Sequence, residues 1–596
     1  MKKTVSDPPL NHESVCSFRN TRELIEALGI ALILAFLFKA YIIELYCIPT
    51  GSMASTLMGR HKDVRCEVCG FPFQLGASEE SNEGKANPRP KDRLPSVIGG
   101  TCPQCQYTMY VGENNLAGQT YMSFSGDRIF VNKCLFSYRE PSRWHVTVFR
   151  YPATPQIFYI KRLIGQENET VMLRNGQVFV QKEGSGNFEI QRKPLRVLQA
   201  LLRPVDDNDH VFPEIHELGW KTRWYGDEHW QRSADYKSFT GTNRTEETAW
   251  LKFRHITATT SDWYQLIQGK LPAVNPTGTP QLITDFVAYN SHLTYYPPSP
   301  QYDVRTIESS LDGSTKGRQL CMRTAGGLGL NWVGDLAVRC SLNIEQAEGT
   351  VSFRLIKGGI HFQCDLAPAA GTAVFSIPEV PEFEPFSVEV PIRAGRKHEV
   401  MFCNIDEEMR LIIDGKEIDT KGKGCYDSFC LDDSPLSRDR SPTALDLEPA
   451  AIGIRETSVR VEHLKIERNL YYISCNGETR DRDNCDLIHS PFRYDFSFNE
   501  ENVKRILSTP EYWTDFGKTH RTTFKLEKDQ FLMCGDNSAA SKDSRLWTED
   551  GIPHYVERQY LIGEAICVFW PHGLRIPIPG TKLAVIPNFP KMRWID

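Results

Sequence analysis

The chain has 596 residues, of which 40% are hydrophobic, and a formal net charge of −6. Because this charge is mild for the length, the composition gives no electrostatic footprint for nucleic acid, and none is expected as a partner. The length leaves room for two to four domains.

The first feature along the chain is an apolar run of 20 residues from Leu24 to Ile43. A buried core helix and a cleaved secretory signal are alternatives, but the run exceeds a usual signal core and no small-x-small cleavage site follows it. Its length matches the roughly 20 residues that span a bilayer. The sequence therefore predicts a transmembrane anchor over 24–43, with the lipid bilayer as a partner.

Basic residues precede this run, namely Lys2, Lys3, Arg19 and Arg22. The positive-inside rule therefore leaves residues 1–23 in the cytoplasm and exports the rest of the chain. The expected location is a single-pass protein of the cell membrane (the inner or plasma membrane) with an extracytoplasmic catalytic domain.

The string Ile48-Pro-Thr-Gly-Ser52-Met comes shortly after the apolar run. Proline fixes one backbone angle and glycine permits angles that other residues avoid, so Ser52 is expected on a constrained bend. Such turns are common, and the serine becomes a candidate nucleophile only if the chain also supplies a base.

Two Cys-x-x-Cys pairs, Cys66/Cys69 and Cys102/Cys105, bracket a polar loop in the segment 65–105. Four thiolates suit tetrahedral Zn²⁺, and four protein ligands leave no open position for catalysis. Two disulfides are the alternative, because thiols oxidise outside the cytoplasm. Both readings stay open, and the paired spacing favours a structural zinc in a zinc-ribbon-like insertion.

Short β-rich runs follow from about Phe124 to Val180, with a two-residue hairpin signal at Arg174-Asn-Gly-Gln177. In the extended run around Lys161, alternation places this lysine on the face of Tyr159 and Leu163. Apolar neighbours would desolvate the ammonium and lower its pKa, which makes Lys161 the candidate base. The alternative is a lysine that reaches solvent from a strand edge.

In the segment 204–467 the sequence changes to regularly spaced short runs of alternating apolar and polar residues, which predict a β-sandwich. Its last third resembles laminin-G/concanavalin-like jelly rolls, at His398–Lys416 and Val459–Arg468. Such folds bind glycans or proteins, but fold analogy alone assigns no ligand to this segment. Because no candidate catalytic residue lies inside it, the sequence predicts a separable passenger domain.

Four stretches of the chain stand out together: Ile48-Pro-Thr-Gly-Ser52-Met-Ala-Ser-Thr-Leu57, Gly126-Asp-Arg-Ile-Phe-Val-Asn-Lys133, Tyr159-Ile-Lys161-Arg-Leu-Ile-Gly165 and Gly535-Asp-Asn-Ser-Ala-Ala-Ser541-Lys-Asp543-Ser-Arg545. Together they resemble the bacterial type I signal peptidase family. Their order is that of the family, and the resemblance covers the anchor and under half of the chain.

The resemblance implies the catalytic roles. Ser52 would attack the scissile carbonyl and Lys161 would act as the general base, with no cofactor for catalysis. The Ser52 N–H and the Thr50 hydroxyl resemble an oxyanion hole. Ser541 resembles the hydroxyl that orients the lysine amine.

The resemblance also implies supporting and substrate-binding residues. Asp543 and Arg545 resemble an ion pair, and Asp536 a further structural carboxylate. The shallow pockets for small substrate side chains would be lined by Ile48, Leu57 and Ile160.

The sequence thus predicts a mostly β protein with an N-terminal transmembrane helix, a signal-peptidase-type catalytic domain and two insertions, one zinc-ribbon-like and one a large β-sandwich. The expected segments are 1–23 (cytoplasmic tail), 24–43 (anchor), 44–64, 106–203 and 468–596 (peptidase), 65–105 (zinc-ribbon-like) and 204–467 (sandwich).

The predicted function is a membrane-anchored Ser/Lys-dyad endopeptidase that removes signal peptides from exported preproteins after an A-x-A-like site. The alternative is a surface-anchored glycan- or protein-binding module on a degenerate peptidase scaffold. The intact Ser52 and Lys161 argue against that alternative.

Overall fold

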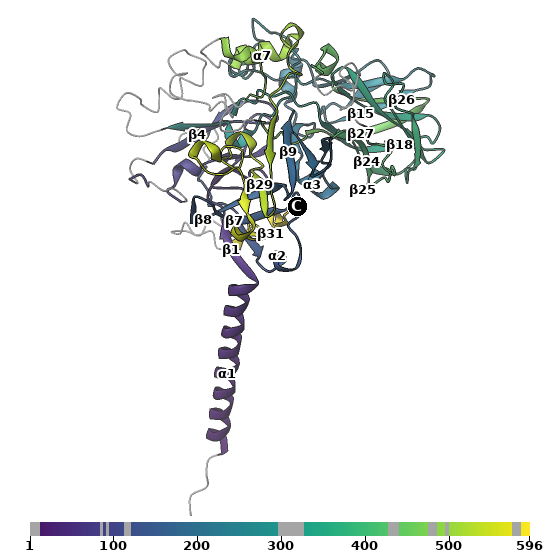
Figure 1. The fold of residues 1–596 in the computed structure, drawn as a ribbon. Helices are drawn as coiled ribbons and strands as arrows, with labels where there is room; N and C mark the ends of the chain where they lie inside the picture. Colours follow the sequence, from purple (N-terminus) through teal and green to yellow (C-terminus); the bar gives the residue numbers. More distant parts are fainter. Residues whose placement is uncertain are drawn as a thin grey trace, which may run out of the picture.

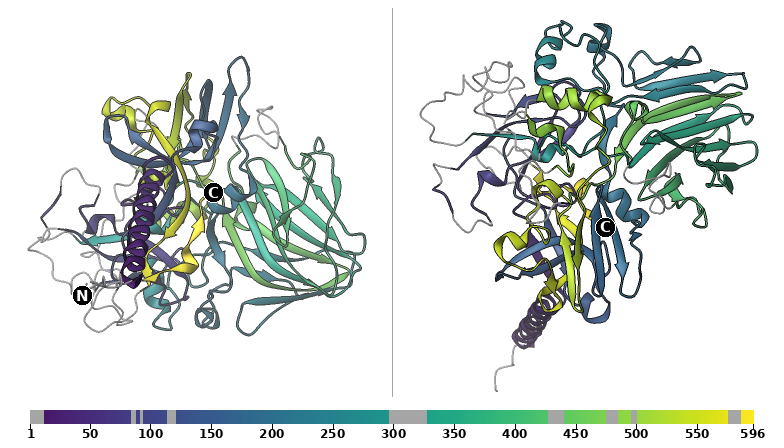
Figure 2. Two further views of the ribbon diagram at one scale, coloured as in Figure 1. Left: turned by 90° about the horizontal axis from the view of Figure 1, so that it is seen from below. Right: turned by 45° about the horizontal axis from the view of Figure 1, so that its top comes forward.

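The computed structural model describes residues 12–83, 88–90, 94–112, 121–295, 327–426, 440–474, 485–494, 500–574 and 586–596. Figure 1 shows a mostly β molecule in which a sandwich of teal and green strands lies beside a second β-rich body, and helix α1 projects away from that body. Both views of Figure 2 keep the sandwich on one side of the body that carries the yellow C-terminal strands.

Helix α1 spans His12–Tyr41. Across the described residues, no helix combines the length and apolarity that crossing a membrane requires. The structure therefore contradicts the transmembrane helix of the predicted fold class and confirms that the protein is mostly β.

The first sheet of the second body has eight strands in the order β1-β6-β31-β7-β8-β29-β30, with β34 paired to β31. All of its paired neighbours are antiparallel. The strands are β1 (Ile43–Cys47), β6 (Arg128–Asn132), β7 (Val146–Tyr151), β8 (Thr154–Gly165), β29 (Gln530–Cys534), β30 (Val556–Glu557), β31 (Leu561–Trp570) and β34 (Arg593–Trp594). Strands from both ends of the chain thus alternate in one sheet.

A four-stranded sheet in the order β11-β10-β9-β28 adjoins it. Its strands are β9 (Glu169–Arg174), β10 (Gln177–Lys182), β11 (Glu189–Ile190) and β28 (Thr522–Lys525). Strands β9 and β10 pair from Arg174 to Gln177 across Asn175 and Gly176, both with positive φ. This geometry confirms the predicted two-residue hairpin.

The cysteine pairs lie on two small hairpins, β2 (His61–Arg65) with β3 (Pro72–Gly76), and β4 (Ser96–Thr101) with β5 (Thr108–Tyr110). Strand β17 (His292–Tyr295), from the predicted passenger segment, adds to β4 as a third strand. The two parts therefore share a sheet.

The sandwich has two antiparallel sheets, in the orders β14-β15-β27-β18-β23-β24-β25 (β12 pairs β27) and β13-β16-β26-β19-β20-β21-β22. The first contains β12 (Arg203–Asp207), β14 (Trp230–Arg232), β15 (Ser238–Asn243), β18 (Leu336–Ile344), β23 (Lys397–Ile405), β24 (Glu408–Ile413), β25 (Lys416–Glu417) and β27 (Thr457–Arg468). The second contains β13 (Trp224–Gly226), β16 (Ala249–Phe253), β19 (Thr350–Lys357), β20 (Ile360–Ala367), β21 (Thr372–Ser376), β22 (Phe386–Glu389) and β26 (Ala450–Arg455).

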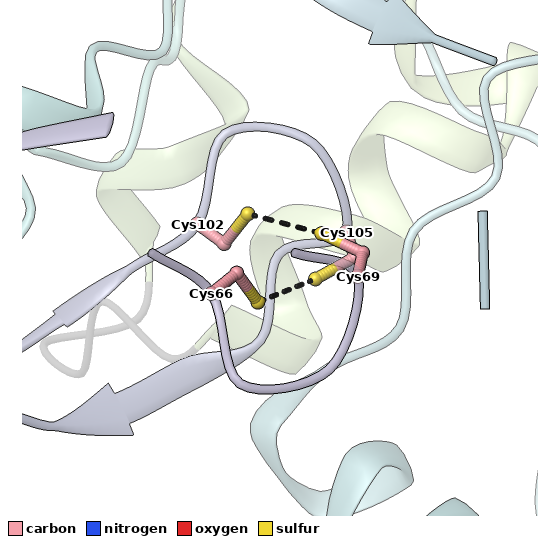
Figure 3. Close-up of side chains that lie close together, drawn as sticks. All are labelled: Cys66, Cys69, Cys102 and Cys105. Atoms are coloured by element: carbon pink, nitrogen blue, oxygen red, sulfur yellow. Dashed lines mark hydrogen bonds between the residues drawn. The ribbon is translucent and has the colours of Figure 1, made fainter. Parts of the chain in front are cut away.

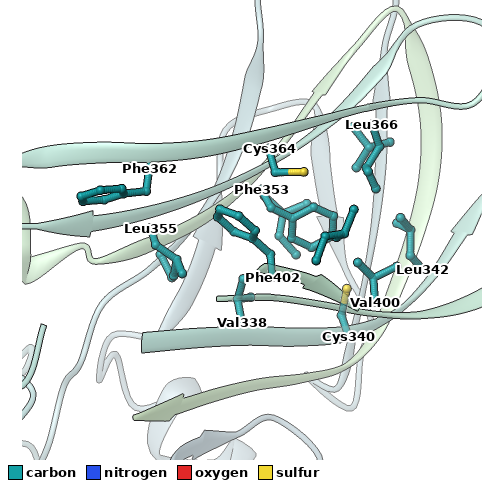
Figure 4. Close-up of a cluster of buried hydrophobic side chains, with 14 of the residues drawn as sticks. Val338, Cys340, Leu342, Phe353, Leu355, Phe362, Cys364, Leu366, Val400 and Phe402 are labelled. Carbon is teal, nitrogen blue, oxygen red and sulfur yellow. The ribbon is translucent and has the colours of Figure 1, made fainter. Parts of the chain in front are cut away.

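The core between these sheets follows from sequence alternation. On β20, burial alternates so that Ile360, Phe362, Cys364 and Leu366 point inward. Figure 4 shows such side chains meeting those of the opposite sheet, for example Phe402. The predicted β-sandwich is present, and its laminin-G-like identity stays a prediction.

Buried contacts join the sandwich to the second body. Helix α3 (Leu195–Leu201) packs Leu198 against sandwich residues that include Met401. Lys193 Nζ and Asp406 Oδ1 form a buried ion pair at 2.8 Å. The remaining helices and short strands are α2 (Leu135–Tyr138), α4 (Pro213–Glu217), α5 (Thr260–Leu266), α7 (Glu500–Ser508), β32 (Gly573–Leu574) and β33 (Ile586–Pro587).

Candidate active site

Ser52 lies in the turn that follows β1, and Lys161 lies on β8. The Lys161 Nζ donates a hydrogen bond of 2.6 Å to the Ser52 Oγ and another of 3.1 Å to the Ile160 carbonyl. Only 4% of Lys161 is exposed. The structure thus brings together the two residues that the sequence proposed as nucleophile and base.

The environment of Lys161 favours its neutral form. Burial lowers the pKa of Lys161 from 10.5 to about 8, although the carboxylates of Asp543 and Asp536 act in the opposite direction. The Nζ lies 5.3 Å from the centroid of the Tyr159 ring, so one wall of the site is aromatic. A useful fraction of the amine is therefore unprotonated near neutral pH.

Two buried ion pairs lie next to this site. Asp536 accepts two hydrogen bonds of 2.8 Å from Arg162, which is the residue after the lysine. Asp543 accepts two of 2.8 Å from Arg545. Burial by itself would raise the pKa of each carboxyl, but the arginine beside each one outweighs it and holds that pKa below its ordinary value.

Ser541 is buried in the same site, but its Oγ makes no hydrogen bond within the described part of the chain. A Cβ added at Gly535 would collide with that Oγ and with the Ser52 carbonyl oxygen. Glycine at 535 therefore lets the serine loop and the Ser541 loop approach closely. The hydroxyl lies near the dyad without being bonded to the Lys161 amine.

The other predicted residues lie on the same turn or in its core. Thr50 is exposed on the turn. Ile48 and Leu57 are almost completely buried in a cluster against which the partly buried Ile160 packs. Buried side chains offer little surface to a ligand, so Ile160 is the most accessible of the three.

Sequence reasoning did not single out several residues that hold the turn. Asp127 accepts hydrogen bonds from the Met58 backbone N–H at 2.9 Å and from Arg593 at 3.2 Å. Asn537 donates through Nδ2 to the Gly51 carbonyl at 2.9 Å. The quoted motifs contain Asp127, Arg162 and Asn537. The signal that could have identified them is a polar residue next to a strand that is otherwise apolar and buried.

Comparison with known proteins addresses this site. A family model described as "Signal peptidase, peptidase S26" matches residues 117–236 and 473–570. Signal peptidase I of Aquifex aeolicus is 48% identical over 46 residues, which are 8% of this chain and 18% of that protein. Both matches support the signal peptidase family. Since the chain spans under a fifth of this curated relative's length, the activity and substrates of the whole protein are matters for proposal.

Solved structures resemble only part of the chain. The carbohydrate binding module CBM66 from Bacillus subtilis is 6% identical with a TM-score of 0.20, covering 41% of this chain and 96% of that one. The galectin LEC-6 of Caenorhabditis elegans is 10% identical with a TM-score of 0.16, covering 22% and 83%. At such low TM-scores these similarities support no conclusion about a ligand of the sandwich.

The cysteine quartet forms a compact cluster (Figure 3). The Sγ atoms of Cys66 and Cys105 are 3.6 Å apart, and those of Cys69 and Cys102 are 3.7 Å apart. A disulfide requires about 2.05 Å. Four thiolates at about 2.3 Å from a central Zn²⁺ would lie about 3.8 Å from one another. These separations therefore match the spacing of thiolates around a tetrahedral metal and exceed a disulfide bond length.

The backbone around the quartet repeats the same pattern twice. Cys66 N–H donates to the Phe71 carbonyl and Gly70 N–H to that of Cys66. In the second knuckle, Cys102 N–H donates to the Tyr107 carbonyl and Gln106 N–H to that of Cys102. Gly70 and Gln106 both have positive φ. Two equivalent knuckles facing each other are typical of a zinc ribbon.

A second group of metal-ligating types, His61, Asp63 and His572, also lies together. The Lys591 Nζ lies 2.8 and 2.7 Å from the two Asp63 oxygens and 3.1 Å from His572 Nε2. An ammonium of the chain itself therefore neutralises this group, and the contact fastens the C-terminal residues to β2.

Proposed function

We propose that this protein is a signal-peptidase-type serine endopeptidase in which Ser52 is the nucleophile and Lys161 the general base. The observation that carries the proposal is the 2.6 Å contact between the Ser52 hydroxyl and the amine of Lys161, a residue that is 4% exposed. A buried amine with a pKa of about 8 suits general base catalysis near neutral pH. The family matches supply independent support.

The chemistry follows from these two side chains. Neutral Lys161 takes the Ser52 hydroxyl proton as Oγ forms a bond to the scissile carbonyl carbon, and the carbonyl oxygen becomes an oxyanion. The Ser52 N–H and the Thr50 hydroxyl would donate to this oxyanion. Protonated Lys161 then gives its proton to the leaving amine as the C–N bond breaks. The resulting ester is hydrolysed by a water that Lys161 deprotonates, and that proton returns to the Ser52 Oγ.

The strand edges beside the dyad suit an extended peptide. Strand β29 pairs with β8 only from Arg162 to Gly165, so the β8 edge before Lys161 has no ladder partner on that side among the described strands. Strand β1 likewise pairs only with β6 there. The rings of Tyr46 on β1 and Phe158 on β8 are 5.5 Å apart, so the two edges lie close together.

An exported preprotein could bind along these edges as an added strand, with its A-x-A-like site extended beside Lys161. These edges therefore support exported preproteins as the proposed substrates. The half-exposed side chains of Leu45, Ile157 and Phe158 would cover the apolar part of such a peptide. Because exported preproteins are processed after translocation, this activity belongs outside the cytoplasm. The ligand of the sandwich, whether glycan or protein, is not needed for this chemistry.

The cysteine quartet is proposed as a structural zinc site held by Cys66, Cys69, Cys102 and Cys105. Four thiolates saturate a tetrahedral ion, so zinc would stabilise the two hairpins and take no part in peptide hydrolysis.

A cleavage assay tests the function. The purified protein is incubated with a preprotein that carries an Ala-x-Ala signal peptide, and the product's new N-terminus is sequenced. We expect cleavage after the second alanine, and none with Ser52→Ala. Uncleaved preprotein in the presence of folded wild-type protein would overturn the proposal and favour the binding-module alternative.

A further inference from the structure

The predicted passenger segment reaches the serine turn through the short 3₁₀ helix η3 (Ala288–Asn290), just before β17. Asn290 Nδ2 donates to the Asn537 Oδ1 at 2.7 Å, and Asn537 Nδ2 donates to the Asn290 Oδ1 at 2.8 Å. Both residues are buried. The two amides therefore form a reciprocal pair between residues 247 positions apart in the sequence.

Asn537 connects Asn290 to the turn that carries the nucleophile. Its Nδ2 also donates to the Gly51 carbonyl at 2.9 Å, and its backbone N–H donates to the Ser52 carbonyl at 3.1 Å. A rotated Asn537 amide would turn its oxygen toward the Gly51 oxygen, where two acceptors repel. The amide pair could form with both amides rotated together, but only the present orientation also bonds Gly51.

Tyr289, the neighbour of Asn290, packs on the same turn. Its hydroxyl donates to the Arg60 carbonyl at 3.0 Å. A Cβ added at Gly51 or at Gly76 would collide with its ring, which is therefore enclosed between the serine turn and the first cysteine hairpin. Tyr289 thus contacts the turn that carries Ser52 directly, and Asn290 reaches this turn through Asn537.

We propose that Asn290 is a positioning residue for the nucleophile and acts through Asn537, so that the segment 204–467 is part of the catalytic unit. This inference rests on the proposed function and replaces the expectation of a separable passenger. The Asn537 side chain of this pair holds the Gly51 carbonyl and its backbone N–H holds the Ser52 carbonyl, and these fix the direction from which the Ser52 Oγ meets the Lys161 amine.

Loss of this support should lower kcat and leave substrate binding nearly unchanged, because Asn290 lies in η3 and the proposed substrate binds along the strand edges of β1 and β8. A misplacement of about 1 Å at a reacting group costs about 100-fold in rate. We therefore expect Asn290→Ala to lower kcat about 10- to 100-fold, with KM within about threefold of wild type.

The experiment is a double-mutant cycle on the full-length protein with Asn290→Ala, Asn537→Ala and both together. If Asn290 acts through Asn537, the double variant should have the same kcat as Asn537→Ala alone. The inflection of the pH–kcat profile should stay near pH 8 in Asn290→Ala, because the surroundings of Lys161 are unchanged. Multiplying losses in the double variant, or a wild-type kcat in Asn290→Ala, would overturn the inference.

Asn243→Ala is the matched control. Asn243 is a buried asparagine of the sandwich whose Nδ2 donates to the Glu247 carbonyl at 2.6 Å and to that of Ile454 at 2.9 Å. It should retain wild-type kcat, and an equal loss in this variant would assign the effect to general destabilisation and refute the positioning role. If Asn290→Ala does not fold, Asn290→Ser replaces it with the same criteria. Inactive wild-type protein would instead count against the proposed function.

Discussion

Replacing Lys161 by methionine should abolish peptidase activity and yet stabilise the fold at neutral pH. Methionine nearly matches lysine in length and needs no hydration. The difference between a pKa of about 8 in the fold and the ordinary 10.5 corresponds to about 3 kcal/mol of unfavourable burial of the ammonium. Loss of the hydrogen bonds to Ser52 and Ile160 offsets this by about 1 kcal/mol each. The expected net gain at pH 7 is therefore about 1–2 kcal/mol.

The pH dependence gives a sharper test, because those offsets do not vary with pH. Between pH 8 and 10.5 the unfolded wild type keeps a proton on Lys161 that the folded protein has lost. The unfolded state therefore binds more protons, and raising the pH favours the folded wild type. The stability advantage of Lys161→Met should shrink by about 2 kcal/mol between pH 7 and pH 9.5.

Chemical denaturation of both proteins across this pH range measures the difference. Other tyrosines and cysteines titrate in both proteins, so their contributions cancel. In parallel, the wild-type rate should rise about tenfold per pH unit below pH 8 and then level off. A difference in unfolding free energy that stays constant from pH 7 to pH 9.5 would refute a buried lysine with a lowered pKa.

Three other outcomes are expected. Ser52→Ala and Lys161→Arg should each abolish cleavage and leave the circular dichroism spectrum unchanged. Alanine has no hydroxyl to attack the carbonyl, and arginine cannot act as a neutral base near pH 7. Cleavage by Lys161→Arg in a single-turnover assay would exclude the dyad. Protein purified without chelator should contain about one zinc per chain, lost in Cys66→Ser and retained in Cys340→Ser, a buried sandwich cysteine; zinc-free protein with four oxidised thiols would mean disulfides. Asp536→Ala should lower the free energy of unfolding by about 3–5 kcal/mol, because it leaves Arg162 buried without its carboxylate. The control Asp515→Ala, which removes an exposed pair with Lys518, should not change this free energy. Wild-type stability in Asp536→Ala would contradict the importance of the buried pair.

Local patterns in the sequence determined the features that need only neighbouring residues. Asn175-Gly176 specifies a two-residue turn because both positions accept positive φ. Strand alternation predicted the sandwich because inward and outward side chains repeat with a period of two. The two cysteine knuckles follow from tight turns with a residue of positive φ after each pair.

The proposed nucleophile and base could be named from motifs, but the distance between them could not. Ser52 and Lys161 are 109 residues apart in the sequence, and only the sheet that pairs β8 with β7 and β29 brings the amine to the hydroxyl. The same sheet buries Lys161 and determines its pKa. The apolar run at the N-terminus shows the limit of pattern reading, since no helix among the described residues is long and apolar enough to cross a membrane.

The contact between the insertion and the serine turn depends on tertiary structure alone. Asn290 lies in a segment with no catalytic motif, and no local pattern marks it. It meets Asn537 because β17 joins the cysteine hairpins while the sandwich packs on α3, which leaves η3 against the serine turn. Hydrogen bonds between residues so distant depend on how whole domains pack, and that packing energy is distributed over many contacts which no single stretch of sequence contains.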